Sequence, residues 1–411
     1  MPPVNPSRGM RDFLPADKRR RDLVLDAIRS TYRSYGFDEI ETPVVEDSSR
    51  LHAGLGGDNE KLAFAIMKRA LTVDDLRAAD APLDLADLGL RFDLTVPLAR
   101  FYASHRGELP TVFRSIQIAP VWRAERPQKG RYRQFVQCDI DIIGEPGALA
   151  EIELLTATSA VLERLGIERA TIRINDRRIL LALLAHWQVP IDRFDPALVI
   201  IDKLDKIGVD GVVAELAEID VPREGLAEQL GELAHADWSI GRAAPDWLDT
   251  EAFADLVALR DAIPGAEIEF DPTLVRGMGY YTGTIFEVAH PDFGYSLGGG
   301  GRYDGMIGRF LGQDVPAAGF SLGFERLVDL VTLDTGDAGG LALVYDRSLD
   351  PVDLVRLQGE LVARGRRVRL ERRAKNFSNQ LASLGAAGYT EFAAVREAGV
   401  SAEELEIREI G

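Results

Sequence analysis

The chain has 411 residues, 46% hydrophobic and 28% charged, a size and composition that allow two or three packed domains. Its net charge of −18 argues against binding nucleic acid over the whole surface, so any contact with RNA must come from local basic patches. The single cysteine excludes an internal disulfide framework and fits a reducing cytoplasm, and we find neither an apolar signal core nor an apolar run long enough to span a membrane.

Residues 8–15, RGMRDFLP, form an irregular stretch that ends in proline. Apolar residues then recur at helical spacing, with Asp17 placed to cap a helix and Gly36 placed to end it. Residues 37–47, FDEIETPVVED, predict a strand that stops at Pro43, because proline cannot donate to a sheet. Any amphipathic helix followed by a strand gives this pattern, so these elements alone indicate no function.

Residues 52–68 begin as a glycine-rich loop, which fits no phosphate-loop spacing, and then predict a strand. Residues 71–88 are rich in Asp and Ala and predict a helical excursion or a surface loop. Residues 90–100, LRFDLTVPLAR, bring Asp93 and Thr95 two positions apart, on one side of the chain if the segment is extended.

Residues 112–123 and 132–143 are β-like runs on either side of a polar loop, so the simplest structure is a β-hairpin. Because side chains alternate along a strand, one face of the second strand carries a polar row: Arg131, Arg133, Phe135, Gln137, Asp139 and Asp141. The other face is apolar and includes Cys138, which we expect to be a packed core thiol. The polar row could hold a ligand, or it could be the solvated face of a surface hairpin.

The residues of this hairpin carry a resemblance. Residues 122–135, WRAERPQKGRYRQF, place Arg before Ala-Glu at the end of one strand and Phe on the return strand, and this arrangement resembles motif 2 of class II aminoacyl-tRNA synthetases. The string ERPQKGRYRQF is similar to the histidyl-tRNA synthetase family in particular. Residues 8–15 resemble the opening of that family, and the helix and strand before Pro43 resemble motif 1, which forms the family's dimer interface.

Residues 148–165 predict a core helix, and residues 171–263 are largely helical and acidic. The second stretch resembles the insertion that the family carries between motifs 2 and 3, which leans over the acceptor end of tRNA.

Residues 274–288, LVRGMGYYTGTIFEV, have a strand-like pattern and resemble a histidine-specific segment of the family, in which Asp is common at the position of Gly279. Residues 298–305, GGGGRYDG, resemble a second such segment, and consecutive glycines let backbone approach a ligand closely. Residues 319–327, GFSLGFERL, resemble motif 3.

The resemblance implies roles for eleven residues. The catalytic cations would be Arg123, at the α-phosphate of ATP, and Arg276, at the transferring phosphoryl group. ATP would be bound by Arg123, Glu125, Arg131 and Arg326. Histidine would be bound by Asp93, Thr95, Gln137, Asp141, Tyr280 and Tyr281. These residue types suit the chemistry, because fixed guanidinium groups stabilise phosphoryl charge and a buried carboxylate can recognise an imidazole.

Beyond residue 340 the pattern changes to an alternation of strands and helices, βαβαβ, which predicts a small three-layer domain. It contains a group of basic residues: Arg364, Arg366, Arg367, Arg369, Arg372, Arg373 and Lys375. An RNA-facing patch and a solvated surface fit this group equally well. The segment resembles the anticodon-binding domain of the family.

These observations predict an α+β fold: a class II synthetase antiparallel sheet of six or seven strands flanked by helices, a helical insertion and a small C-terminal α/β domain. The predicted boundaries are 1–170 for the catalytic domain with motifs 1 and 2, 171–263 for the insertion, 264–335 for the rest of the catalytic domain, and 340–411 for the C-terminal domain.

The implied reaction is ATP-dependent activation of L-histidine to histidyl-adenylate and transfer to tRNA(His), in a cytoplasmic homodimer, with Mg2+ bridging the phosphates of ATP. The five histidines lack the spacing of metal ligands, so we expect no metal held by the protein alone. Two alternatives share the fold: a regulatory subunit of ATP phosphoribosyltransferase, and a ligase that uses a small amine acceptor. The retained Arg123, Arg276 and Arg326 favour the tRNA-charging enzyme.

Overall fold

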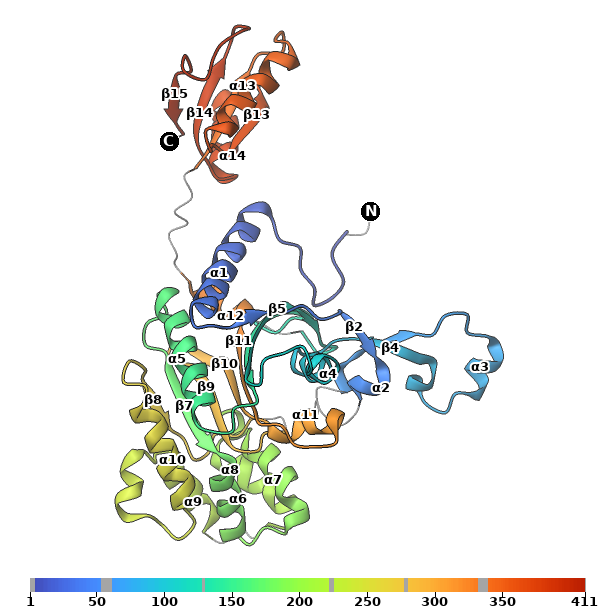
Figure 1. The fold of residues 1–411 in the computed structure, drawn as a ribbon, viewed down its shortest axis with the longest axis vertical. Coiled ribbons are helices and arrows are strands. Elements are labelled where there is room, and N and C mark those ends of the chain that lie inside the picture. The colour runs from blue at the N-terminus through green and yellow to red at the C-terminus, as the bar shows by residue number, and fades with distance from the viewer. Residues whose placement is uncertain are drawn as a thin grey trace. The chain divides into compact units, whose positions relative to one another are not determined.

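The computed structural model describes residues 4–52, 61–127, 130–221, 225–276, 280–331 and 339–410 (Figure 1). The chain divides into two compact units, which comprise residues 1–11 with 24–332 and residues 12–23 with 333–411. Among the described residues, no helix has both the length and the apolar character needed to cross a bilayer.

The larger unit is built on an eight-stranded sheet. In spatial order its strands are β1 (Asp38–Glu39), β5 (Phe113–Trp122), β6 (Gln134–Ile143), β11 (Ala317–Gly323), β10 (Phe293–Arg302), β9 (Thr284–His290), β7 (Thr171–Asp176) and β8 (Ile268–Phe270). The central pairs are antiparallel, as predicted. The short edge strands β1 and β8 pair in parallel with their neighbours and bring the number of strands to eight rather than six or seven.

The hairpin of β5 and β6 is confirmed, with Phe113 opposite Ile143 and Trp122 opposite Gln134. On the apolar face of β6, Cys138, Ile140 and Ile142 are fully buried and Val136 is partly buried, and helix α5 (Leu149–Arg164) packs on β6 and β11. Cys138 lies on this buried face, so its prediction as a core thiol is also confirmed.

The N-terminal elements differ from the prediction in two ways. Helix α1 (Pro15–Ser34) begins two residues before Asp17, so Asp17 does not cap the helix. It lies in the first turn, where the carboxylate interacts favourably with the helix dipole. The strand predicted to stop at Pro43 is present but shorter, because β1 already ends at Glu39, and the chain beyond Pro43 leaves the large sheet. A second strand, β2 (Val45–Asp47), pairs instead with β4 (Ala86–Leu90), which also pairs with β3 (Phe64–Met67).

The larger unit also contains these helices outside the insertion: α2 (Ser48–Leu51), α3 (Val73–Ala78), the 3-10 helix η2 (Pro82–Leu85), α4 (Thr95–His105), α11 (Asp304–Leu311) and α12 (Phe324–Leu330). Of the two alternatives for residues 71–88, a helical excursion or a surface loop, the structure has the first, in α3 and η2, and it ends as the chain enters β4.

The segment predicted as a helical insertion from residue 171 opens with β7, a strand of the large sheet. Helices begin at Arg177, where the side chain of Asp176 accepts a hydrogen bond from the backbone N–H of Arg178. They are α6 (Arg177–His186), η3 (Ile191–Arg193), α7 (Phe194–Ile201), α8 (Leu204–Glu218), α9 (Leu226–Leu233), η4 (Trp238–Ala243) and α10 (Thr250–Asp261). Figure 1 shows α6 to α10 gathered together at the bottom of the view.

The smaller unit contains β12 (Gly340–Tyr345), α13 (Pro351–Ala363), β13 (Val368–Arg372), α14 (Phe377–Ala386), β14 (Tyr389–Val395) and β15 (Ile407–Glu409). Its sheet has the order β13-β12-β14-β15, with β12 parallel to both neighbours and β15 antiparallel to β14. The predicted βαβαβ alternation is therefore confirmed, with one further strand at the edge.

Candidate active site

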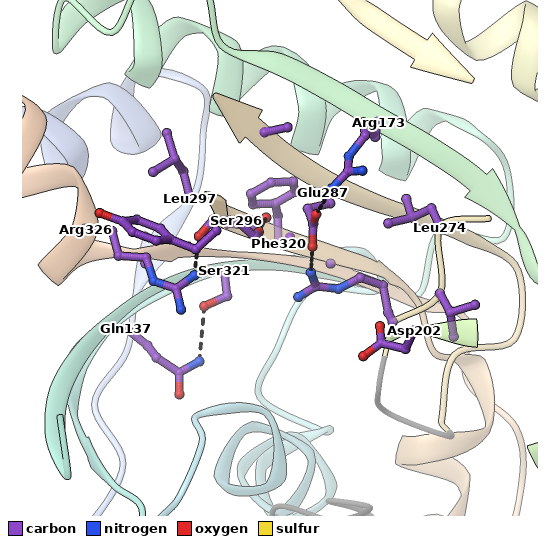
Figure 2. Close-up of a pocket in the computed structure, with 18 of the residues that line it drawn as sticks. Gln137, Arg173, Asp202, Leu274, Glu287, Ser296, Leu297, Phe320, Ser321 and Arg326 are labelled. Atoms are coloured by element: carbon purple, nitrogen blue, oxygen red, sulfur yellow. Dashed lines mark hydrogen bonds and ion pairs between the residues drawn. The ribbon is translucent and has the colours of Figure 1, made fainter. Parts of the chain in front are cut away.

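A cavity of about 1030 Å³ opens on the polar face of the large sheet (Figure 2). Its walls come from β6, β9, β10 and β11, from the irregular segment around residues 271–276, and from the α7–α8 corner of the insertion. All eleven residues singled out from the sequence line it: Asp93, Thr95, Arg123, Glu125, Arg131, Gln137, Asp141, Arg276, Tyr280, Tyr281 and Arg326. The fold thus brings together residues from both halves of the chain, while their individual roles stay predictions.

The register of the sheet aligns polar residues into a row across five strands. Asp139 of β6 is paired with Ser321 of β11, which is paired with Gly299 of β10. The row continues through Glu287 of β9 to Arg173 of β7. Because residues paired across neighbouring strands project to the same face, this row forms part of the cavity floor.

Glycines in β10 leave space that side chains of another segment occupy. A Cβ at Gly299 would lie 2.7 Å from Cζ of Arg276, and a Cβ at Gly301 would lie 2.8 Å from Cδ1 of Tyr281. Real Cβ atoms are not found this close to other heavy atoms. A Cβ at these positions would also meet backbone, the carbonyl oxygen of Phe286 at 2.7 Å and that of Thr284 at 2.5 Å. The approach of this backbone to a ligand stays a prediction.

Arg123 lies just after β5, and its Nε donates to the carbonyl of Phe92 at 2.9 Å. Burial lowers the pKa of Arg123, and Asp93 acts in the opposite direction. The conditional prediction of an extended segment around Asp93 and Thr95 is wrong, because Thr95 begins α4 and Asp93 accepts a hydrogen bond from the N–H of Val96 at 3.1 Å. Aspartate commonly stabilises a first helical turn in this way, and both side chains still line the cavity.

Gln137 has its amide group fixed by two neighbours. Its Nε2 donates to Oγ of Ser321 at 3.1 Å and to Oδ2 of Asp139 at 3.2 Å. Its Oε1 is buried and has no hydrogen-bond partner within the described part of the chain. Asp139 was not assigned a role from the sequence, although it belongs to the predicted polar row. Burial, followed by the charge of Asp141, raises the pKa of Asp139 well above its usual range.

Asp141 lies deep in the cavity, 4% exposed, and accepts a hydrogen bond from the hydroxyl of Tyr303 at 2.6 Å. Burial raises the pKa of Asp141 to about 7, although the hydroxyl acts to lower it. The rings of Tyr280 and Tyr303 meet edge to face, with centroids 6.0 Å apart. Tyr303 was missed as a site residue, and its only signal in the sequence was its place in the GGGGRYDG run.

Arg276 lies outside any strand, which corrects the strand predicted for residues 274–288, since β9 begins only at Thr284. Its Nη1 donates to Oε2 of Glu287 at 2.5 Å. Burial acts to lower the pKa of Arg276, but nearby charges led by Glu287 outweigh it and the net shift is upward. Gly279, the departure from the histidine-specific segment that the sequence shows, lies outside the described residues.

Arg326, in the first turn of α12, hydrogen-bonds the carbonyl of Ser296, and its Cζ lies 5.0 Å from the centroid of the Tyr295 ring. Burial, and then the charge of Arg131, lower its pKa. Arg131 itself pairs with Glu125 at 3.4 Å. Arg131 and Arg326 thus add two cations to the lining of the cavity.

The basic stretch of the smaller unit is largely satisfied within that unit. Arg364 pairs with Glu403, Arg366 with Glu391 and Arg369 with Glu371. Two further arginines lie over aromatic rings, Arg367 over Tyr389 and Arg373 over Phe377. The choice between an RNA-facing patch and a solvated surface therefore stays open for this stretch as a whole.

Comparison with known proteins gives consistent results. The sequence model of the family described as histidyl-tRNA synthetase matches residues 9–327. The histidine–tRNA ligase of Leifsonia xyli subsp. xyli is 57% identical over an alignment 424 residues long, which covers 99% of this chain and 98% of the relative. The probable histidine–tRNA ligase of Tropheryma whipplei strain Twist is 44% identical over 408 residues, or 95% of each chain.

Among solved structures, the histidyl-tRNA synthetase of Nostoc sp. PCC 7120 has a TM-score of 0.78 at 25% identity and covers 99% of this chain and 95% of its own. An ATP phosphoribosyltransferase regulatory subunit/histidyl-tRNA synthetase from Bacillus halodurans C has the same TM-score at 22% identity, covering 96% and 98%, and supports the fold alone. The chain belongs to the histidyl-tRNA synthetase family of class II aminoacyl-tRNA synthetases.

Proposed function

We propose that the protein is a histidine–tRNA ligase that activates L-histidine with ATP and then transfers the histidyl group to the terminal ribose of tRNA(His). The observation that carries this proposal is the cavity, which is lined both by the guanidinium groups of Arg123, Arg276 and Arg326 and by the buried carboxylates of Asp139 and Asp141. A polyphosphate suits the guanidinium groups, and an amino acid with an ammonium group and an imidazole suits the carboxylates.

Histidine would lie along β6. Its ammonium group would be near Asp93, Thr95 and Oε1 of Gln137, whose free acceptor suits an N–H donor. Its imidazole would meet the carboxylate of Asp141, with Tyr280 and Tyr281 beside it. Because an ionised carboxylate accepts hydrogen bonds and cannot donate them, this pocket selects a side chain that carries an N–H group.

ATP would place its α-phosphate between Arg123 and Arg276, with Glu125, Arg131 and Arg326 holding the rest of the nucleotide. A carboxylate oxygen of histidine attacks the α-phosphorus, the bond to the bridging oxygen breaks, and pyrophosphate leaves. Charge accumulates on the phosphorus centre during this step, and guanidinium groups that are already oriented stabilise it. Catalysis then depends on positioning and charge and needs no strong base.

Mg2+ would enter as part of the nucleotide substrate. The described residues contain no group of three or more His, Cys, Asp or Glu side chains arranged to hold a metal. Magnesium that bridges phosphates needs only one or two protein carboxylates, and Glu125, which the proposal already places at the nucleotide, lines the cavity, so this residue fits such an ion. It would neutralise phosphate charge.

The homodimer and the cytoplasmic location are part of the same proposal. Motif 1 leaves apolar side chains at the surface of the larger unit, including Tyr35 at 43% and Val44 at 38% exposure. Retention of Arg123 and Arg276 in one cavity, together with a folded C-terminal unit, favours the enzyme over the regulatory paralogue.

Transfer of labelled histidine to tRNA by the purified protein, with ATP and Mg2+, tests the proposal. We expect charging of tRNA(His) and no charging with the other amino acids. If the tRNA is charged by another histidyl-tRNA synthetase but not by this protein, while histidine-dependent exchange of pyrophosphate into ATP persists, the acceptor is wrong and a small-amine ligase is favoured. Absence of both activities would favour the regulatory subunit.

A further inference from the structure

Glu287 divides its two carboxylate oxygens between two arginines. Oε2 accepts a hydrogen bond from Nη1 of Arg276, and Oε1 accepts one from Nη2 of Arg173, each at 2.5 Å. The side chain is 14% exposed and lies on the cavity floor, where Figure 2 shows it beside Arg173. With both oxygens engaged, the carboxylate is fixed in orientation.

Arg173 is itself anchored away from the reacting centre. Its Nη1 lies 3.2 Å from Oδ2 of Asp271 and 3.6 Å from Oδ2 of Asp205, at the start of α8. Arg173 and Glu287 are paired residues of adjacent strands, so the rigid sheet sets the distance between them. Asp271 gives Arg173 a second anionic partner. Glu287 therefore does not have to neutralise Arg173 by itself and can also pair with Arg276.

Arg276 needs such support because it comes from an irregular segment and not from a strand. Within the described residues, the contact with Glu287 is the one hydrogen bond of its guanidinium. Because residue 299 is a glycine, no Cβ occupies the space next to the guanidinium of Arg276, and no side chain at that position contacts it. One nitrogen is therefore fixed, while the remaining N–H groups are available to a phosphate.

We infer that Glu287 is the positioning residue of Arg276: it holds the guanidinium over Gly299, at the place where the transferring phosphoryl group would lie, and Arg173 holds Glu287. This inference rests on the proposed function and adds to it two residues, Glu287 and Arg173, that touch neither substrate. A displacement of about 1 Å at a reacting centre can cost about 100-fold in rate, so losing the anchor should reduce turnover strongly.

The test is histidine-dependent exchange of labelled pyrophosphate into ATP by the full-length protein. For Glu287→Gln we expect kcat to fall about 100-fold, because Arg276 acts on charge that develops in the transition state, with KM for histidine within about twofold of the wild-type value. Glu269→Gln is the matched control. Glu269 is exposed, lies opposite Arg173 on its other side, in β8, and does not line the cavity, so we expect wild-type kinetics.

A double-mutant cycle separates positioning from a general structural role. In an Arg276→Ala background, Glu287→Gln should change the residual exchange rate by less than about twofold, because the group that Glu287 positions is absent. An equal loss in both backgrounds would overturn the inference, as would a single Glu287→Gln variant with near-normal kcat.

If the Glu287→Gln variant does not fold, as judged by its thermal unfolding, Glu287→Asp is the alternative, because it retains the charge but is too short to reach both arginines. We expect about a tenfold loss for it, and wild-type kcat would overturn the inference.

The same assay distinguishes failure of this inference from failure of the proposed function. If wild-type protein shows no histidine-dependent exchange, the proposed function is wrong. If wild-type protein is active and Arg276→Ala is equally active, the role of Arg276 is wrong, and Glu287 then has nothing to position.

Discussion

In the cavity, Arg123 and Arg276 are partly buried, and each gives only part of its donor capacity to one fixed acceptor. In the smaller unit, Arg364 and Arg369 are about half exposed, at 50% and 51%, and pair with glutamates of the same unit. The first pair is oriented in advance by groups that belong to the sheet or its flanks. The second pair is solvated, and one of its partners, Glu403, is itself 80% exposed.

This difference shows why the number of arginines in a segment is a poor guide to its function. Exposed ion pairs contribute about 0–1 kcal/mol and are screened by salt. Guanidinium groups recessed in a low-dielectric cavity act with little reorganisation when charge develops beside them. The following experiments test whether the two regions differ in this way.

The largest effect is expected for Arg276→Ala in the cavity. Removal of the guanidinium should reduce histidine-dependent pyrophosphate exchange by at least about 1000-fold, because one preorganised donor to a charged transition state is worth about 100- to 1000-fold and this group also carries a full charge. The Tm should change by only a few degrees, as measured by circular dichroism. A variant with wild-type exchange would show that this arginine resembles those of the smaller unit.

Gly299→Ala tests the floor beneath that arginine. Its methyl group would lie 2.7 Å from Cζ of Arg276 and equally close to the carbonyl oxygen of Phe286, so the guanidinium must move. We expect kcat for exchange to fall about 30- to 100-fold. Gly305→Ala in α11 is the control, because no atom lies within 4 Å of a Cβ there. Similar kinetics for the two variants would mean that the glycine is dispensable.

Tyr303→Phe should shift the pH dependence of histidine binding. The pKa of Asp141 is about 7, and the hydroxyl of Tyr303 acts to lower it, so its loss should raise that pKa further. A smaller fraction of Asp141 is then ionised at pH 7, and we expect KM for histidine to rise about three- to tenfold there and to converge with the wild-type value above about pH 9. The ratio of KM between variant and wild type at each pH cancels the titration of free histidine. A constant ratio would contradict the assignment.

The smallest effects are expected in the smaller unit. Arg372 is exposed and has no ion-pair partner among the described residues, whereas Arg366 pairs with Glu391. If the basic stretch faces RNA, Arg372→Ala should raise KM for tRNA about threefold and reduce its salt dependence, because one cation that can contact phosphate is lost. Arg366→Ala should change KM for tRNA by less than about 1.5-fold, and neither should alter pyrophosphate exchange. Equal effects of the two substitutions on KM for tRNA would mean that an ion pair with a glutamate does not decide whether an arginine of this unit contributes to tRNA binding.

The elements that depend on the spacing of side chains within a short stretch could be predicted from the sequence. The hairpin, its polar and apolar faces, the buried Cys138 and the alternation of the smaller unit follow from period-two and period-3.6 spacing over short windows. Resemblance of motifs then collected the eleven cavity residues. Strand β7 was hidden, because six residues of alternating character next to a long helical stretch do not show which sheet they join.

Three residues of the cavity were missed for a common physical reason. Asp139, Tyr303 and Glu287 each have a partner more than 10 residues away in the sequence, namely Ser321, Asp141 and Arg276, and no short window contains these contacts. Likewise, nothing local indicates that Gly299 lies under Arg276. Cross-strand neighbours are a property of the folded sheet, and the sequence alone does not reveal them.

The pairing of β6 with β11 also has a consequence during synthesis of the chain. β6 ends at Ile143, and β11, its neighbour in the sheet, begins at Ala317, about 170 residues later. At translation rates of about 5–20 residues per second, this edge of β6 waits roughly 10–30 s on the ribosome without its partner. An unpaired strand edge next to an apolar face invites association with other chains. Among neighbouring strands of the described sheet, β6 and β11 are the furthest apart in sequence, so this edge of the nascent hairpin is the one that stays unpaired longest.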